Sequence, residues 1–141
     1  MTKTLKQAAE ALYPGLLHNG FSIEAIHPYR SPNGGVYHRV VRWKNATGQK
    51  EIRPIYLSKQ GTYECGLSPL EPRPIYGLHL LTTRPEEPVT VVEGEACADA
   101  LEALGLLVTT NSGGADSADK ADWSVLAGRA VRLWRDFDGA G

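Results

Sequence analysis

The chain has 141 residues, enough for one compact domain or for a small domain with part of a second. Hydrophobic residues make up 42% and charged residues 22%, so extended disorder is excluded. The only two cysteines, Cys65 and Cys97, exclude a disulfide framework and a four-cysteine zinc site. No apolar run approaches the roughly 18 residues of a membrane span, and the N-terminus lacks the apolar block of a secretion signal. These features predict a cytoplasmic protein without a membrane partner.

The charges are distributed unevenly along the chain. Residues 1–60 hold nine basic and three acidic residues, a net charge of +6, while residues 61–141 hold six basic and thirteen acidic ones, a net charge of −7. Such asymmetry favours a first part that faces a polyanion and a second part that collects cations. Ordinary solvated surface charge explains the counts equally well.

The N-terminal segment predicts a short helix. Thr4 and Gln7 have the spacing of a capping box, in which each side chain satisfies a free backbone donor of the first turn. The helix is expected to continue to about Tyr13 and to end at Pro14-Gly15.

Residues 36–57 predict a β-hairpin. The runs "VYHRVVRW" and "KEIRPIYL" are rich in β-branched and aromatic residues, and "NATGQ" between them supplies a turn. Because Pro54 has no backbone N–H, the second strand is predicted to be an edge strand or to carry a bulge. The stretch "GTYECGL" is compatible with a third short strand, and the proline-rich residues 68–88 with an ordered crossing segment.

After Pro88 the pattern alternates between strands and helices. "VTVVEG" is the apolar run of a strand buried on both faces, and "EACADALEALG" has helical spacing with Gly105 as its C-terminal cap. The segments "LLVTT" and "AVRLWR" predict two more strands, separated by a helical turn in "KADWSVLAG" with Asp119 or Asp122 as N-cap. The expected fold class is α/β, with a basic, hairpin-rich α+β region at 1–86 and an open parallel sheet at 87–141.

Three carboxylates follow two of the predicted parallel strands. Glu93 comes directly after the first, and Asp136 and Asp138 come after the third. Because parallel strands end at one edge of their sheet, the three side chains are expected to converge if these strands are neighbours. Hard oxygen ligands of this kind suit Mg²⁺. Without a metal, the aspartates would be a helix N-cap and a turn residue, and Glu93 a solvated strand end.

The same residues resemble a known family. "VVEGEACADAL", followed by "LWRDFDGAG", resembles the Toprim domain, whose signature is a glutamate after the first strand and Asp-x-Asp after the third. With "RPIYGLHLL", "KADWSVLAG" and the basic segment "YHRVVRWKNATGQKEIRPIYL", the chain from about Tyr29 to Gly141 is similar to the Toprim-containing DNA primases of phages and plasmids, which are often fused to helicases.

This resemblance implies a partial Toprim-type, Rossmann-like parallel sheet and a role in DNA replication. The implied activity is nucleotidyl transfer from nucleoside triphosphates into a primer on single-stranded DNA, with a replicative helicase as a further partner. The implied catalytic and metal-binding residues are Glu93, Asp136 and Asp138, holding Mg²⁺ or Mn²⁺. Family members continue with a helix and a strand beyond the motif, so the chain is expected to be a fragment or a short member.

The basic hairpin offers an interpretation of a different class. Its cations alternate with aromatic residues, so the hairpin could follow a phosphate backbone while rings stack on bases. An amphipathic hairpin that only covers a sheet explains the pattern equally well. The alternative function is therefore a non-catalytic single-stranded-DNA-binding or assembly module with a vestigial Toprim site. The candidate nucleic-acid-binding residues are Arg39, Arg42, Lys44, Lys50 and Arg53.

Other residues near the predicted edge receive structural interpretations. The loop 111–114 either approaches a phosphate or is a simple connection, and Glu95 is expected to face solvent. Asp99 is expected to be a surface or capping partner. The aromatic residues Trp123, Trp134 and Tyr76 are expected to anchor the core.

Overall fold

The computed structural model describes residues 3–134. The chain divides into two compact units, one formed by the residues up to Pro28 with Val36–Pro69 and the other by Tyr29–Gly35 with the chain from Leu70 onward. Residues 70–86 thus group with the strands that follow them. The domain boundary between residues 86 and 87 stays a prediction.

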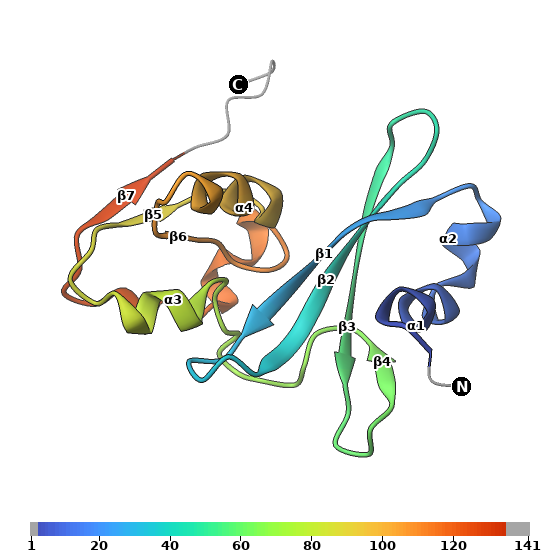
Figure 1. Ribbon diagram of the computed structural model, residues 1–141, viewed down its shortest axis with the longest axis horizontal. Coiled ribbons are helices and arrows are strands. Elements are labelled where there is room, and N and C mark those ends of the chain that lie inside the picture. Colours follow the sequence, from blue (N-terminus) through green and yellow to red (C-terminus); the bar gives the residue numbers. More distant parts are fainter. Residues whose placement is uncertain (1–2, 135–141) are drawn as a thin grey trace. The chain divides into compact units, whose positions relative to one another are not determined.

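The first unit is built on an antiparallel sheet with the strand order β1-β2-β3-β4 (Figure 1). The predicted helix is confirmed as α1, and its capping box is present: the Gln7 N–H donates to Thr4 Oγ1 at 3.1 Å and the Thr4 N–H to Gln7 Oε1 at 2.9 Å. Pro14 begins a second helix. The N–H of the first helical residue has no partner within a helix, so proline, which lacks this group, is well tolerated there. The elements are α1 Leu5–Leu12, α2 Pro14–His18, β1 Ser22–Arg30, β2 Val36–Lys44, β3 Lys50–Leu57 and β4 Tyr63–Cys65.

The hairpin of β2 and β3 is confirmed, but the prediction that β3 is an edge strand or carries a bulge is wrong, since its register with β2 is continuous from Arg39–Ile55 to Lys44–Lys50. β3 lies between β2 and β4, with Pro54 opposite Val40. The Pro54 carbonyl accepts from the Gly66 N–H at 2.9 Å and from the Tyr13 hydroxyl at 2.7 Å. In an antiparallel ladder the N–H and C=O of one residue point to the same side, so the proline nitrogen faces away from β2. Pro54 therefore lies just beyond the residues of β3 that pair with β4, and its missing N–H removes no hydrogen bond between β3 and β2.

One apolar core holds the helices of this unit against its sheet. Val41, Trp43 and Ile55 are fully buried together with Ala9 of α1. The Tyr13 ring meets the Trp43 ring edge-on, with 6.4 Å between ring centroids. Burying large apolar side chains contributes about 1.5–3 kcal/mol each, so this cluster fixes which face of the hairpin α1 covers.

The second unit contains the predicted parallel sheet, with β5 between β6 and β7. The strands predicted from "VTVVEG", "LLVTT" and "AVRLWR" are thus confirmed as parallel neighbours. Helices α4 and α3 lie on opposite sides of these strands (Figure 1). The protein is therefore mixed α/β, with one antiparallel and one small parallel sheet. The elements are α3 Leu78–Thr83, β5 Val89–Val91, α4 Glu95–Ala103, β6 Val108–Thr109, the 3-10 helices η1 Ala115–Lys120 and η2 Trp123–Leu126, and β7 Val131–Leu133.

The ends of the helices in this unit agree with the sequence signals. Gly105 follows α4 with φ +91°, and the Asp122 carboxylate caps η2 by accepting from the Ser124 N–H at 3.1 Å. Helix α3 was not expected, since its segment is rich in proline. None of the helices within residues 3–134 has the length and apolar character needed to cross a bilayer.

Gly77 supports the start of α3 in a backbone conformation that other residues avoid. Its φ is +75°, and a Cβ added there would lie 3.0 Å from the Val108 carbonyl oxygen. We predict that Gly77→Ala lowers the free energy of unfolding by about 1–3 kcal/mol, because it adds both backbone strain and a close contact. Gly15→Ala in α2, where an added Cβ would meet nothing within 4 Å, is the matched control. Urea unfolding followed by circular dichroism measures both, and equal stabilities would contradict the assignment.

Candidate active site

The three parallel strands deliver the chain to one edge of the sheet. The Val92 N–H donates to the Thr109 carbonyl at 3.0 Å, and the Trp134 N–H donates to the Val91 carbonyl at 2.8 Å. These bonds continue the ladders to the last residue of each strand. The segments that follow β5, β6 and β7 therefore start next to one another, as ligand-binding segments do in open parallel sheets.

Glu93 occupies the turn between β5 and α4, and its side chain is exposed. Gly94 has φ +93°, and its N–H donates to Thr110 Oγ1 at 3.2 Å, which ties the turn to the end of β6. No side chain of residues 3–134 forms an ion pair with the Glu93 carboxylate. Its oxygens are thus available to a cation from solution.

The other two predicted metal ligands, Asp136 and Asp138, lie outside the described residues. Trp134, two positions before Asp136, is at the same sheet edge as Glu93 because of its bond to Val91. Within residues 3–134, no three His, Cys, Asp or Glu side chains are grouped to hold a metal ion. The exposed oxygens of Glu93 fit a Mg²⁺ ligand chemically, and the full set of three ligands stays a prediction.

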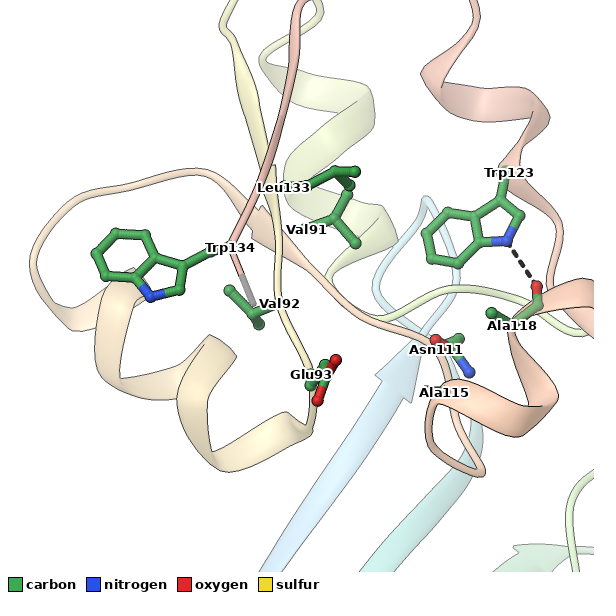
Figure 2. Close-up of a pocket in the computed structure, with 9 residues that line it drawn as sticks. All are labelled: Val91, Val92, Glu93, Asn111, Ala115, Ala118, Trp123, Leu133 and Trp134. Atoms are coloured by element: carbon green, nitrogen blue, oxygen red, sulfur yellow. Dashed lines mark hydrogen bonds between the residues drawn. The ribbon is translucent and has the colours of Figure 1, made fainter. Parts of the chain in front are cut away.

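A cavity of about 350 Å³ opens at this edge, beside Glu93 (Figure 2). Its walls are mostly apolar, and its polar side chains are those of Glu93 and Asn111. Trp123 forms one side of the cavity, and its indole N–H donates to the Ala118 carbonyl at 2.7 Å. The lining residues are Val91, Val92, Glu93, Asn111, Ala115, Ala118, Trp123, Leu133 and Trp134.

Two tyrosine–carboxylate pairs hold the start of α4 behind this edge. The Tyr29 hydroxyl donates to Glu95 Oε2 at 2.7 Å, and the Tyr76 hydroxyl donates to Asp99 Oδ1 at 2.7 Å. The two rings pack with 4.9 Å between centroids, and Tyr29 is fully buried. The expectation that Glu95 only faces solvent is therefore wrong. Since Glu95 is two residues after Glu93, the Tyr29 bond also restrains the turn that carries Glu93.

These pairs keep both tyrosines protonated. Burial raises the pKa of Tyr29 and of Tyr76 far above the ordinary value, and the neighbouring carboxylates Glu95 and Asp99 raise each further. The sequence gives no signal for the Tyr29–Glu95 pair, because its members are 66 residues apart and neither belongs to a local motif.

The candidate DNA-binding residues lie on both faces of the antiparallel sheet. Lys44 is directly opposite Lys50, and Arg42 is the next residue on the same face of β2. Arg39 and Arg53 project from the other face, since they pair with Ile55 and Val41. The structure thus groups three of the five cations and separates them from the other two.

Carboxylates partly neutralise these cations. Glu24 of β1 lies 3.3 Å from Arg42 Nε and 3.8 Å from Lys44 Nζ, and Glu51 lies 2.9 Å from Arg53 Nη1. Partly exposed ion pairs contribute about 0–1 kcal/mol, so phosphates could replace these partners.

Two further residues lie near the edge. Trp134 was expected in the core, but half of its surface is exposed. Asn111 structures the loop after β6, because its side-chain amide donates to the Ser112 carbonyl at 3.1 Å and to the Gly114 carbonyl at 2.7 Å. Gly113 and Gly114 both have positive φ, so this loop is an ordered turn.

No family model, curated protein or solved structure matches this chain.

The tyrosines predict how stability depends on pH. An unfolded tyrosine loses its proton near pH 10, whereas the folded pKa of Tyr29 and Tyr76 is higher and that of Tyr13 is about 12. The folded state thus binds more protons above pH 10, so stability is complete below pH 10 and falls as the pH rises further. The slope approaches about 1.4 kcal/mol per pH unit for each such tyrosine. Urea unfolding between pH 9 and 12 should show a shallower fall for Tyr29→Phe, and identical slopes would contradict the buried pair.

Proposed function

We propose that this chain is a DNA primase-type Toprim protein and that it supports Mg²⁺-dependent nucleotidyl transfer for primer synthesis on single-stranded DNA. One observation carries the proposal. Glu93 lies in the turn directly after the central strand of a parallel sheet, and the chain that leads to Asp136 and Asp138 leaves the neighbouring strand at the same edge. This arrangement is the one expected for a glutamate and an Asp-x-Asp pair that share a cation.

The proposed chemistry requires little covalent catalysis by the protein. Bound Mg²⁺ would neutralise charge on the phosphates during transfer. The part of the carboxylates is to hold the ion at a fixed place on the sheet edge, and the Tyr29–Glu95 bond restrains the turn that carries Glu93. Fixed positioning of this kind supplies much of the rate enhancement in phosphoryl transfer.

Primer synthesis tests this proposal. We predict that the chain forms dinucleotides on a single-stranded template only with Mg²⁺ or Mn²⁺. Glu93→Gln and the double variant Asp136→Asn/Asp138→Asn are expected to lose at least about 100-fold of this activity, since each removes charge from the proposed ion site. Radiolabelled nucleotide incorporation, resolved on a gel, measures the loss.

Glu86→Gln is the matched control for these variants. Glu86 is an exposed carboxylate before β5, at the opposite end of that strand from Glu93. It should keep the activity of the unmodified chain. Equal activity in the Glu93 and Glu86 variants would reject the proposed site.

A second candidate function is a non-catalytic module that binds single-stranded DNA. The observation in its favour is the group of Arg42, Lys44 and Lys50 on one sheet face, where Glu24 is the carboxylate that neutralises two of them. These three cations and Glu24 leave this end of the sheet face positive, as contact with a phosphate backbone requires; Glu64 is on the same face farther along, opposite Tyr56.

Salt dependence of DNA binding tests this second function. Arg42→Ala and Lys50→Ala should each weaken binding to an oligonucleotide and reduce the slope of log affinity against log salt by about 0.7, the value for one phosphate contact. Lys6→Ala on the exposed side of α1 is the matched control and should change neither quantity. Fluorescence anisotropy at several salt concentrations measures both. A salt-independent affinity would contradict a phosphate contact at this face.

A further inference from the structure

The cavity beside Glu93 has a shape and chemistry that a carboxylate metal site does not need. A volume of about 350 Å³ is near the lower end of small-ligand sites, which span roughly 300–1,000 Å³. Val91 and Leu133 are adjacent across the β5–β7 ladder, and both point toward the six-membered ring of Trp123 (Figure 2). The cavity is thus a compact apolar slot between a sheet face and an indole.

Trp123 presents only the carbon atoms of its indole to this slot. Its N–H is held by the Ala118 carbonyl at 2.7 Å, so the indole has no further hydrogen bond to give. The Ala118 side chain is drawn on the cavity side in Figure 2, and its small size leaves the space beside the ring open. A flat, weakly polar ligand part fits such walls better than an ion does.

Asn111 places one polar atom at the end of the slot. Its amide nitrogen is turned to the loop, where it donates to the carbonyls of Ser112 and Gly114 (Figure 2). The amide oxygen is therefore left as an acceptor at the cavity. A hydrocarbon chain would leave this acceptor without a donor, whereas a heterocycle that carries N–H groups would satisfy it.

We infer that this cavity binds the base of a nucleoside triphosphate, with Trp123 and the aliphatic walls around the ring and the Asn111 oxygen accepting from its amino group. The inference rests on the proposed function, because Glu93 at the rim then marks the place of the phosphates and their cation. It adds what that function leaves open, namely where the base lies and that an amino-bearing base is preferred.

Two ligands separate the base from the phosphates. Calorimetry with Mg²⁺ present should show the chain binding ATP about tenfold more tightly than inorganic tripolyphosphate, as expected for one buried and stacked base. Ala118→Leu fills the slot and should bring the ATP affinity down to that of tripolyphosphate, with tripolyphosphate binding unchanged. Ala115→Leu fills the same cavity from the other end of the wall and guards against a folding defect in the first variant. Ala103→Leu adds the same side chain at an exposed position of α4 and should alter neither affinity.

The outcomes distinguish this inference from the function on which it rests. If tripolyphosphate binds with Mg²⁺ and ATP binds no more tightly, or if both filled variants keep the ATP preference, the base site is rejected and the metal site is retained. If neither ligand binds to the folded chain, the proposed function is rejected together with the inference. Loss of the ATP preference in the filled variants alone supports the base site.

Discussion

The position of β5 between two parallel neighbours is the constraint on which the rest of this protein depends. An antiparallel neighbour would send its following segment to the opposite edge of the sheet. Here the ladder bonds from Val92 to Thr109 and from Trp134 to Val91 place three outgoing segments together. The exposed carboxylate of Glu93, the loop of Asn111 and the cavity between them all result from this arrangement.

Hydrogen bonds from other segments hold the turn after β5 and the start of α4 in place. The turn after Glu93 is tied to the end of β6 because the Gly94 N–H donates to the Thr110 hydroxyl, and the first turn of α4 is tied to Tyr29 by Glu95. Tyr29 precedes the hairpin of β2 and β3 in the sequence, and Glu95 follows it. The site therefore requires residues from both segments of the chain. Because the buried tyrosine hydroxyl stays protonated, it can donate to the carboxylate over the whole neutral pH range.

The parts of the fold that are coded locally could be predicted. The continuous apolar run at 89–92 indicated a strand buried on both faces, and the Thr4–Gln7 spacing indicated a helix start. Strand β1 was missed, because its alternation of apolar and polar residues is interrupted by Pro28. The prediction from Pro54 was also wrong. Proline favours an edge strand, but Pro54 lies beyond the residues of β3 that pair with β4, so β3 can be an interior strand. Contacts such as Tyr29 with Glu95 depend on tertiary packing, which local patterns do not carry.

The central claim is that Glu93 and the two aspartates after β7 bind a single divalent ion. Electron paramagnetic resonance of Mn²⁺ tests it directly, because the free ion gives a sharp signal that disappears on binding. The account predicts one bound Mn²⁺ per chain, displaced by Mg²⁺, with an affinity that falls at least about tenfold in Glu93→Gln and in Asp136→Asn/Asp138→Asn alike. Equal Mn²⁺ binding by the unmodified chain and the Glu93 variant, on folded samples, would contradict it.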